Sequence, residues 1–321
     1  MIPYLFGRLV HTLAVLVAAC TLSFALLHFA PGDALAGDTT QAGRTAEARA
    51  QLRTQQGLDA PLATQYTRFV TRALRGDLGR TFTNDRAVSA TVSAALKNSL
   101  LLTGTGLLAA VTLGMLVGGA QGWRPNWLPG RLLGGGLTGL YAVPEFVLAI
   151  GLIGVLSYWT GWFPVGGISD PIVSITGTVM EQYADIARHL VVPALTLALG
   201  WGAAIARQER VALVETAGAD FVRTARAKGL TERQVFLRHA VRPSIPAVVA
   251  IIGTMLPVLV GGAVVVEIVF AWPGMGSLML HALAQRDVPV VSGAILVIAT
   301  MVSASSLCID AAVRLVDPRQ R

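Results

Sequence analysis

Charged residues are scarce in this sequence of 321 amino acids, and lysine is almost absent. Asp, Glu, Lys and Arg make up 13% of the chain, about half of the share that soluble domains usually carry. The two lysines, Lys97 and Lys228, follow Leu96 and Ala227, so neither completes the Gly-Lys-Ser/Thr motif of a phosphate-binding loop. We therefore expect this chain to bind neither ATP nor Mg²⁺.

Patterns typical of catalytic or metal sites are also lacking. Both cysteines, Cys20 and Cys308, lie in apolar segments, which indicates small buried side chains rather than a disulfide framework or metal site. The five histidines show no HExxH spacing, which disfavours a zinc protease. Ser277 follows Gly276 in a predicted outer loop, and nothing there indicates a nucleophile. We expect no catalytic residue, no metal site and no enzyme activity.

Long apolar runs dominate what is present. The chain is 54% hydrophobic and contains 34 glycines, a composition that suits helices packed closely in a bilayer. The first run is longer than the apolar region of a signal peptide, so we interpret it as a retained helix. The prediction is an all-α polytopic membrane protein with six transmembrane helices, at about residues 9–30, 98–120, 132–159, 190–208, 245–269 and 288–312.

Three regions follow from these runs. Residues 1–30 form the N-terminal transmembrane helix, 31–97 an extracytoplasmic insertion with a helix-like stretch from Thr45 to Gln56, and 98–321 a five-helix core with a basic loop at about 209–244. Basic residues in short loops mark the inner side of a membrane. The short outer loops hold only Arg188 and Arg286, so both termini are predicted to be cytoplasmic. The predicted inner side holds Arg8, Arg124, Arg131, the cluster from Arg207 to Arg242, Arg314, Arg319 and Arg321.

The basic loop carries signals for two short helices. Asp220 can cap a helix start, and Gly229 can supply the left-handed turn that ends it. Thr231 and Gln234 then have the spacing of a capping box. The pattern predicts a helix, a tight break and a second helix on the cytoplasmic face. An amphipathic loop attracted to anionic lipid would show the same charges, and a nucleic-acid surface is disfavoured because the basic residues lie between long apolar runs.

A known family shares these motifs. The segment from Arg223 to Gly229 resembles the EAA-x-x-x-G loop of binding-protein-dependent ABC importer permeases, although Arg223 stands where the general motif has Glu. The form RTARAKGL, followed by His239, Pro243 and Pro246, is similar to the dipeptide/oligopeptide/nickel branch. Further matches in order along the chain are Ala30–Asp33, Gly57–Leu62, Gln65–Tyr66, Arg75–Arg80, His189–Leu190, Pro193–Thr196, Glu267, Phe270–Gly276 and Asp317–Arg319.

The resemblance implies a transport subunit of a bacterial or archaeal cytoplasmic membrane. It implies a second related permease subunit, two ATPase subunits that carry ATP and Mg²⁺, an extracytoplasmic substrate-binding protein and surrounding membrane lipid. Dipeptides, oligopeptides, a nickel chelate and glutathione remain open as cargo. In that family the loop is a coupling helix that docks in a cleft of the ATPase. The residues expected to couple are Asp220, Phe221, Arg223, Thr224, Ala225, Arg226, Lys228 and Gly229.

Acidic residues inside apolar spans are costly and are therefore candidates for the substrate pathway. Glu145 follows Pro144 in the third span, where the proline permits a kink. The matching place in the family it resembles is commonly Pro-Ser-Phe, so no family role transfers to Glu145. Glu145 either meets a cationic group of the cargo or is neutral or paired with a neighbouring helix. Glu267 and Asp310 lie near span ends, where a structural role is the stronger interpretation.

Two other functions remain as alternatives. An ion-coupled secondary transporter would also be polytopic, although the internal repeats of many such folds are not visible here. An intramembrane enzyme would need a catalytic pair in the spans, and the sequence offers none.

Overall fold

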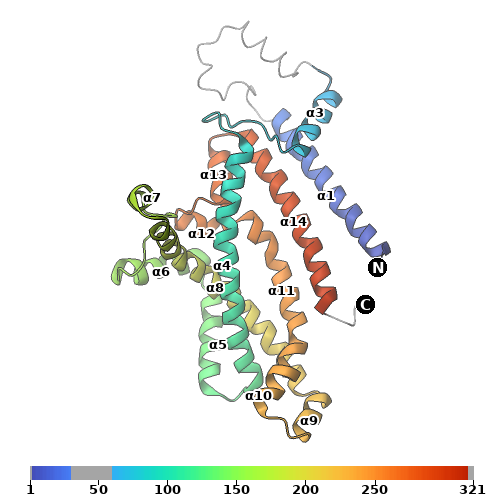
Figure 1. The fold of residues 1–321 in the computed structure, drawn as a ribbon, viewed down its shortest axis with the longest axis vertical. Helices are drawn as coiled ribbons and strands as arrows, with labels where there is room; N and C mark the ends of the chain where they lie inside the picture. The colour runs from blue at the N-terminus through green and yellow to red at the C-terminus, as the bar shows by residue number, and fades with distance from the viewer. Residues whose placement is uncertain (1, 30–59, 317–321) are drawn as a thin grey trace. The chain divides into compact units, whose positions relative to one another are not determined.

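The computed structural model describes residues 2–29 and 60–316. The insertion prediction for 31–59, including the helix-like stretch from Thr45 to Gln56, lies outside the described residues, as do the motifs at Ala30–Asp33 and Asp317–Arg319. The described part is helical, with a single isolated bridge between Arg80 and Ala87. The all-α prediction is confirmed (Figure 1).

Five described helices are long and apolar enough to span a membrane, or six spans if one bent pair is counted as one. They are α1 (Ile2–Phe29), α4 (Val88–Trp123), α8 (Val179–Ala217), α11 (Val241–Gly261) with the turn before it, and α14 (Val288–Val316). Each is built on an apolar run in which the backbone satisfies its own hydrogen bonds, as lipid demands. The polytopic prediction is therefore confirmed.

The chain divides into two compact units. The first comprises residues 1–97 and 274–304, with α1, α3 (Leu62–Leu74), the start of α4, α13 (Met275–Ala284) and most of α14. The start of α4 and α14 approach closely at Gly293, where an added Cβ would lie 2.6 Å from a methyl group of Val88. The core of this unit contains Val88, Val92, Ala95, Met275, Ala282, Val290, Val291 and Ala294.

The second unit comprises residues 98–273 and 305–321 and is organised around α8. Both α11 and α5 (Leu128–Tyr141) pack against α8. The contact of α8 with α4 is tight, since an added Cβ on Gly118 would clash with the carbonyl oxygen of Ala206. Its other elements are α6 (Glu145–Leu152), the π-helical turn η2 (Ile153–Trp159), α7 (Pro171–Thr176), α9 (Asp220–Ala227), α10 (Glu232–Gln234), the π-helical turn η3 (Val235–Ala240) and α12 (Val264–Val269).

Two of the expected spans are interrupted. The span expected at 132–159 is a pair of helices, α5 and α6–η2, which bend by 112° at residues 142–144. The span expected at 245–269 ends as α11 at Gly261, turns at Gly262 with φ +85°, and restarts as α12. Proline and glycine cause these breaks, because Pro144 cannot donate a backbone hydrogen bond and Gly262 adopts a left-handed conformation.

Candidate coupling helix and translocation residues

Helix α9 begins one residue earlier than its sequence signal indicates. Asp220 is the first helical residue, and the extended residue before the helix is Ala219, which offers no side-chain cap. The prediction that Asp220 caps the helix is therefore wrong by one position. The carboxylate of Asp220 still lies in the first turn, where the partial positive charge of the helix favours an acid, and it is 3.5 Å from the guanidinium of Arg223.

The end of α9 is closed as the sequence indicates. Gly229 has φ +80°, so the left-handed turn is confirmed. The amide of Gly229 donates to the carbonyl of Arg226 at 2.9 Å, and the amide of Leu230 donates to that of Ala225 at 3.4 Å. These paired bonds are a Schellman motif, which satisfies carbonyls that a helix end would otherwise leave unpaired. The turn fixes the direction in which the chain leaves the helix.

A capping box starts the next helix. The hydroxyl of Thr231 accepts from the amide of Gln234 at 3.4 Å, and the side chain of Gln234 accepts from the amide of Thr231 at 3.1 Å. This prediction is confirmed. Figure 1 shows α9 and α10 together at the lower end of the second unit. Helices α9 and α10, with the turn between them, form a hairpin. The hydrogen bonds of the Schellman motif and of the capping box fix the shape of that turn.

An apolar contact that the sequence did not reveal anchors α9. Val222 and Val235 are fully buried, Ala225 is almost so, and Trp123 and Leu230 pack against them. Ala225 therefore faces the core of this chain. Trp123 ends α4, about a hundred residues earlier in the sequence, and no local pattern could pair it with α9.

Arg226 is also held within the chain. Its guanidinium donates to the carboxylate of Glu232 at 2.9 Å and lies 5.0 Å from the centre of the Trp123 ring. Stacking of a guanidinium on an indole face is an attractive cation–π contact. Of the basic residues of α9 and its C-cap, Arg226 thus makes contacts outside its own helix, Arg223 lies near Asp220 in the same helix, and Lys228 is exposed.

A second hidden contact joins the helices that lead into and out of the hairpin. Glu209 on α8 is fully buried, and the hydroxyl of Ser244 on α11 donates to its carboxylate at 2.9 Å. The other carboxylate oxygen has no hydrogen-bond partner among the described residues. Burying a carboxyl group that makes a single hydrogen bond costs free energy. Packing alone therefore does not explain why Glu209 stands at the base of the hairpin.

The three pathway candidates lie in different surroundings. Pro144 precedes α6 at the bend, and Glu145 is the first residue of α6, exposed on the surface of the chain. Glu267 is instead fully buried in the second unit, where the hydroxyl of Ser99 donates to it at 2.6 Å. The indole of nearby Trp272 donates to the carbonyl of Asn98 at 2.9 Å. Glu267 therefore connects α12 to α4 through its hydrogen bond with Ser99.

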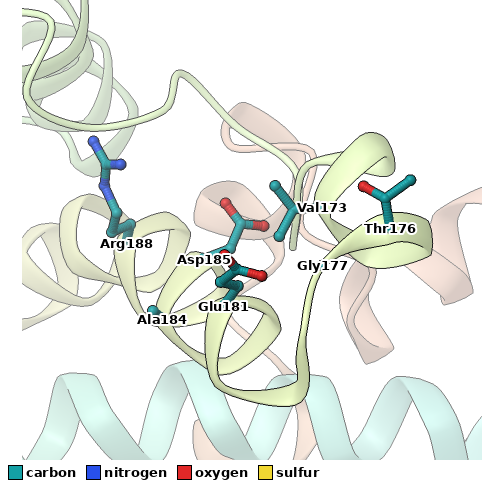
Figure 2. A pocket seen from close by; sticks show the side chains of 7 residues that line it. All are labelled: Val173, Thr176, Gly177, Glu181, Ala184, Asp185 and Arg188. Carbon is teal, nitrogen blue, oxygen red and sulfur yellow. The ribbon is translucent and has the colours of Figure 1, made fainter.

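The opposite end of α8 carries a cavity of about 430 Å³. Figure 2 shows the carboxylates of Glu181 and Asp185 side by side in it, with Arg188 extending away from them. Asp185 accepts from the amide of Asp170 at 2.7 Å, and Arg188 donates to the carbonyl of Trp162 at 3.2 Å. These side chains bond to the backbone of the loop that contains α7. Their contacts therefore indicate a structural role in holding that loop rather than a ligand site.

Several long apolar helices, a broken span and a capped hairpin at one end of α8 are the features of a polytopic helical membrane protein. Residues 110–321 match the family described as "Binding-protein-dependent transport system inner membrane component", and residues 1–103 match the N-terminal family of such membrane components. The chain belongs to this family. It is the permease subunit of a binding-protein-dependent ABC importer in the inner membrane, not the ATPase, and the predicted resemblance is confirmed.

Proteins similar to this chain over almost their whole length carry related names. A peptide permease protein of Brucella ovis is 36% identical, with 99% of each chain covered. The glutathione transport system permease protein GsiC of Salmonella paratyphi A is 34% identical over 100% of this chain and 99% of its own. The dipeptide transport system permease protein DppB of Escherichia coli K12 is 32% identical with the same coverage.

A solved structure shares the fold. A chain of the methionine ABC transporter MetNI in an inward-facing form aligns with a TM-score of 0.52 and 18% identity, and the match covers 70% of this chain and 96% of that one. At this identity the likeness supports the helical architecture alone.

Proposed function

We propose that this chain forms part of a pathway that carries peptides or peptide-like solutes into the cell, and that ATP energy enters it through α9. The observation that carries the coupling role is the closed hairpin, anchored by Val222, Ala225 and Val235 against Trp123. The cargo class is supported by full-length similarity to proteins named for peptide, dipeptide and glutathione transport.

The exposed side of α9 is the surface proposed to meet an ATPase. Phe221, Arg223, Thr224 and Lys228 are exposed, whereas Val222 and Ala225 face inward. Phe221 offers an apolar contact, and Arg223 and Lys228 can pair with acidic side chains of a partner. Two ATPases, a second related permease and an external binding protein complete the proposed assembly, with both termini of this chain in the cytoplasm.

The bend at residues 142–144 supports a pathway role for Glu145. Backbone outside a helix is tolerated at membrane depth only where protein buries it or where it lines a water-filled cavity. Glu145 is exposed at this bend, at the start of α6, where its carboxylate also meets the positive end of the helix. We propose that Glu145 faces the pathway and meets the amino group of a peptide.

Reconstitution with its partner subunits tests this function. The importer should hydrolyse ATP faster when its binding protein delivers a short peptide, and this chain purified alone should hydrolyse none. Glu145→Gln should raise the peptide concentration needed for half-maximal uptake severalfold, while N-acetylated peptides, which lack the amino group, should show little change. Equal effects on both peptide classes would contradict the role of Glu145.

The ion-coupled alternative makes the opposite prediction. Uptake into vesicles by this chain alone, abolished by an uncoupler, would overturn the ATP-driven proposal. Uptake that requires internal ATP and persists with the uncoupler would support it.

A further inference from the structure

A second cavity lies beside the anchored side of the coupling hairpin. It has a volume of about 500 Å³ and is bounded by the end of α4, the connection to α5, α10, η3, the start of α11 and Glu209 of α8. Its walls are mainly apolar and aromatic, formed by Met115, Leu116, Trp123, Trp127, Phe236, Leu237 and Val241. Leu116 is 68% exposed and Leu237 53% exposed, so apolar surface continues from the cavity to the outside of the chain.

The charges around this cavity are unevenly placed. Arg124 and Arg233 line it, are exposed, and have no ion-pair partner in the described parts of the chain. Glu232 also lines it but is neutralised by Arg226 at 2.9 Å. Glu209 lies on its buried side, bonded to Ser244. The exposed side of the cavity therefore presents two free guanidinium groups above an apolar interior.

We infer that this cavity binds an anionic phospholipid of the inner leaflet. Its phosphate would meet Arg124 and Arg233, and part of one acyl chain would lie against the apolar walls. Basic pockets between helices on the cytoplasmic side suit anionic lipid headgroups, and tryptophan is favoured at the same depth of the bilayer. Guanidinium groups also hold phosphate with paired hydrogen bonds. The buried carboxyl of Glu209 keeps the headgroup at the exposed side.

The bound lipid would act on coupling, a step that rests on the proposed role of α9. Trp123 is a wall of this cavity and also packs against α9. Its ring stacks under Arg226 and lies 5.3 Å from that of Phe236. An acyl chain against these rings would fill the space behind the hairpin and limit its retreat when the ATPases close. Occupancy should therefore increase the ATP hydrolysis that cargo stimulates.

Lipid retention measures the binding directly. The complete importer is purified in detergent from membranes that contain phosphatidylglycerol and phosphatidylethanolamine, and its bound lipids are counted by native mass spectrometry. The double variant Arg124→Gln with Arg233→Gln should lower phosphatidylglycerol retention at least about fivefold, because both phosphate contacts are lost. Gly119→Leu should also lower it, since Gly119 lines the cavity and a larger side chain would occupy its interior.

The matched control is Arg207→Gln with Arg238→Gln, which removes two exposed arginines of the same region that do not line the cavity. It should change retention less than twofold. Equal losses in the two double variants, or equal retention of phosphatidylethanolamine and phosphatidylglycerol, would overturn the site. Loss of a partner subunit with lipid unchanged would also overturn it, because the cavity would then be a subunit contact.

Transport assays separate binding from its effect. In nanodiscs with phosphatidylglycerol, the cavity variants should lower cargo-stimulated ATP hydrolysis about two- to fivefold relative to the control pair. Normal hydrolysis in a variant that has lost its lipid would overturn the effect on coupling and leave the binding site standing. Failure of α9 variants to change hydrolysis would instead count against the coupling role itself.

Discussion

Both ends of α8 adjoin a short helix, and the two short helices are held in different ways. At the N-terminal end of α8, which we expect to be the outer end, α7 has no buried residue, and its loop depends on Asp170, which caps the helix, and on Asp185, which accepts from the amide of Asp170. At the C-terminal end, which we expect to be the inner end, α9 buries Val222 and Ala225 against Trp123. Exposed polar contacts contribute little each, whereas a fully buried valine such as Val222 contributes about 1.5–3 kcal/mol. The inner end is thus the firmer of the two.

This difference suits the proposed roles of the two ends. A contact that transmits movement must keep its shape under load, whereas a loop that meets varied partners can adapt. The comparison would fail if the two ends lay on the same side of the membrane, or if both tolerated substitution equally.

The largest expected effect is all-or-none and concerns membrane sidedness. In a background with Cys20 and Cys308 replaced by alanine, Ser174→Cys at the outer end should react in intact cells with an impermeant maleimide. Glu215→Cys at the inner end should react only after the cells are permeabilised. Both positions are exposed in this chain. Labelling of Glu215→Cys in intact cells would contradict the orientation, which rests on the distribution of basic residues.

The next effect concerns the turn that closes α9. Gly229→Val places a β-branched residue at φ +80°, at a cost of about 1–3 kcal/mol. An added Cβ would meet no other atom within 4 Å, so the cost is conformational rather than steric. The variant should insert and assemble but lose cargo-stimulated hydrolysis and uptake together, by about tenfold, the factor that 1.4 kcal/mol gives.

The matched pair for this test is Gly229→Ala and Gly218→Ala. Gly218 ends α8 with φ −82°, an ordinary conformation with room for a Cβ, so its variant should behave as the unchanged protein. Gly229→Ala should lie between Gly218→Ala and Gly229→Val in coupled hydrolysis. Assembly and normal transport by Gly229→Val would show that α9 does not transmit movement.

The smallest effect is expected at the outer end. Asp185→Asn keeps an oxygen that can accept from the amide of Asp170 but removes the charge that lies 3.3 Å from His189. A change of this kind costs about 0.5–1.5 kcal/mol in local stability. Peptide-stimulated hydrolysis should fall less than about twofold. A tenfold fall in a normally assembled importer would make the outer end as sensitive as the inner one and remove the distinction.

Local signals in the sequence were sufficient for the elements of the hairpin. The left-handed turn at Gly229 and the capping box of Thr231 and Gln234 are decided by residues within three positions of one another. The predicted start of α9 was wrong by one residue, because an acid such as Asp220 is favoured both as a cap and in the first turn of a helix. The apolar runs likewise predicted the spanning helices, since each run must satisfy its backbone within itself.

Contacts between distant segments could not be predicted in the same way. Three such contacts join residues that are far apart in the sequence. The bond from Ser244 to Glu209 spans 35 positions, and the bond from Ser99 to Glu267 spans 168. The stack of Arg226 on Trp123 spans about a hundred. Their partners depend on how the helices pack. Pro144 indicated a kink, but the 112° bend depends on the packing of α6 against α8 and α12.

Helix α8 runs for 39 residues without a break, from a capping box at Thr178 to Gly218. At 1.5 Å per residue its length is about 58 Å, roughly twice the thickness of the hydrocarbon layer. A rod of this length converts small rotations into large displacements, so a tilt of about 5° moves one end by about 5 Å relative to the other. Pro193 lies inside it and lacks the amide that would bond the preceding turn, which marks the place where bending would cost least. A slight tilt of α8 would thus displace the hairpin at one of its ends by several ångströms relative to the loop of α7 at the other.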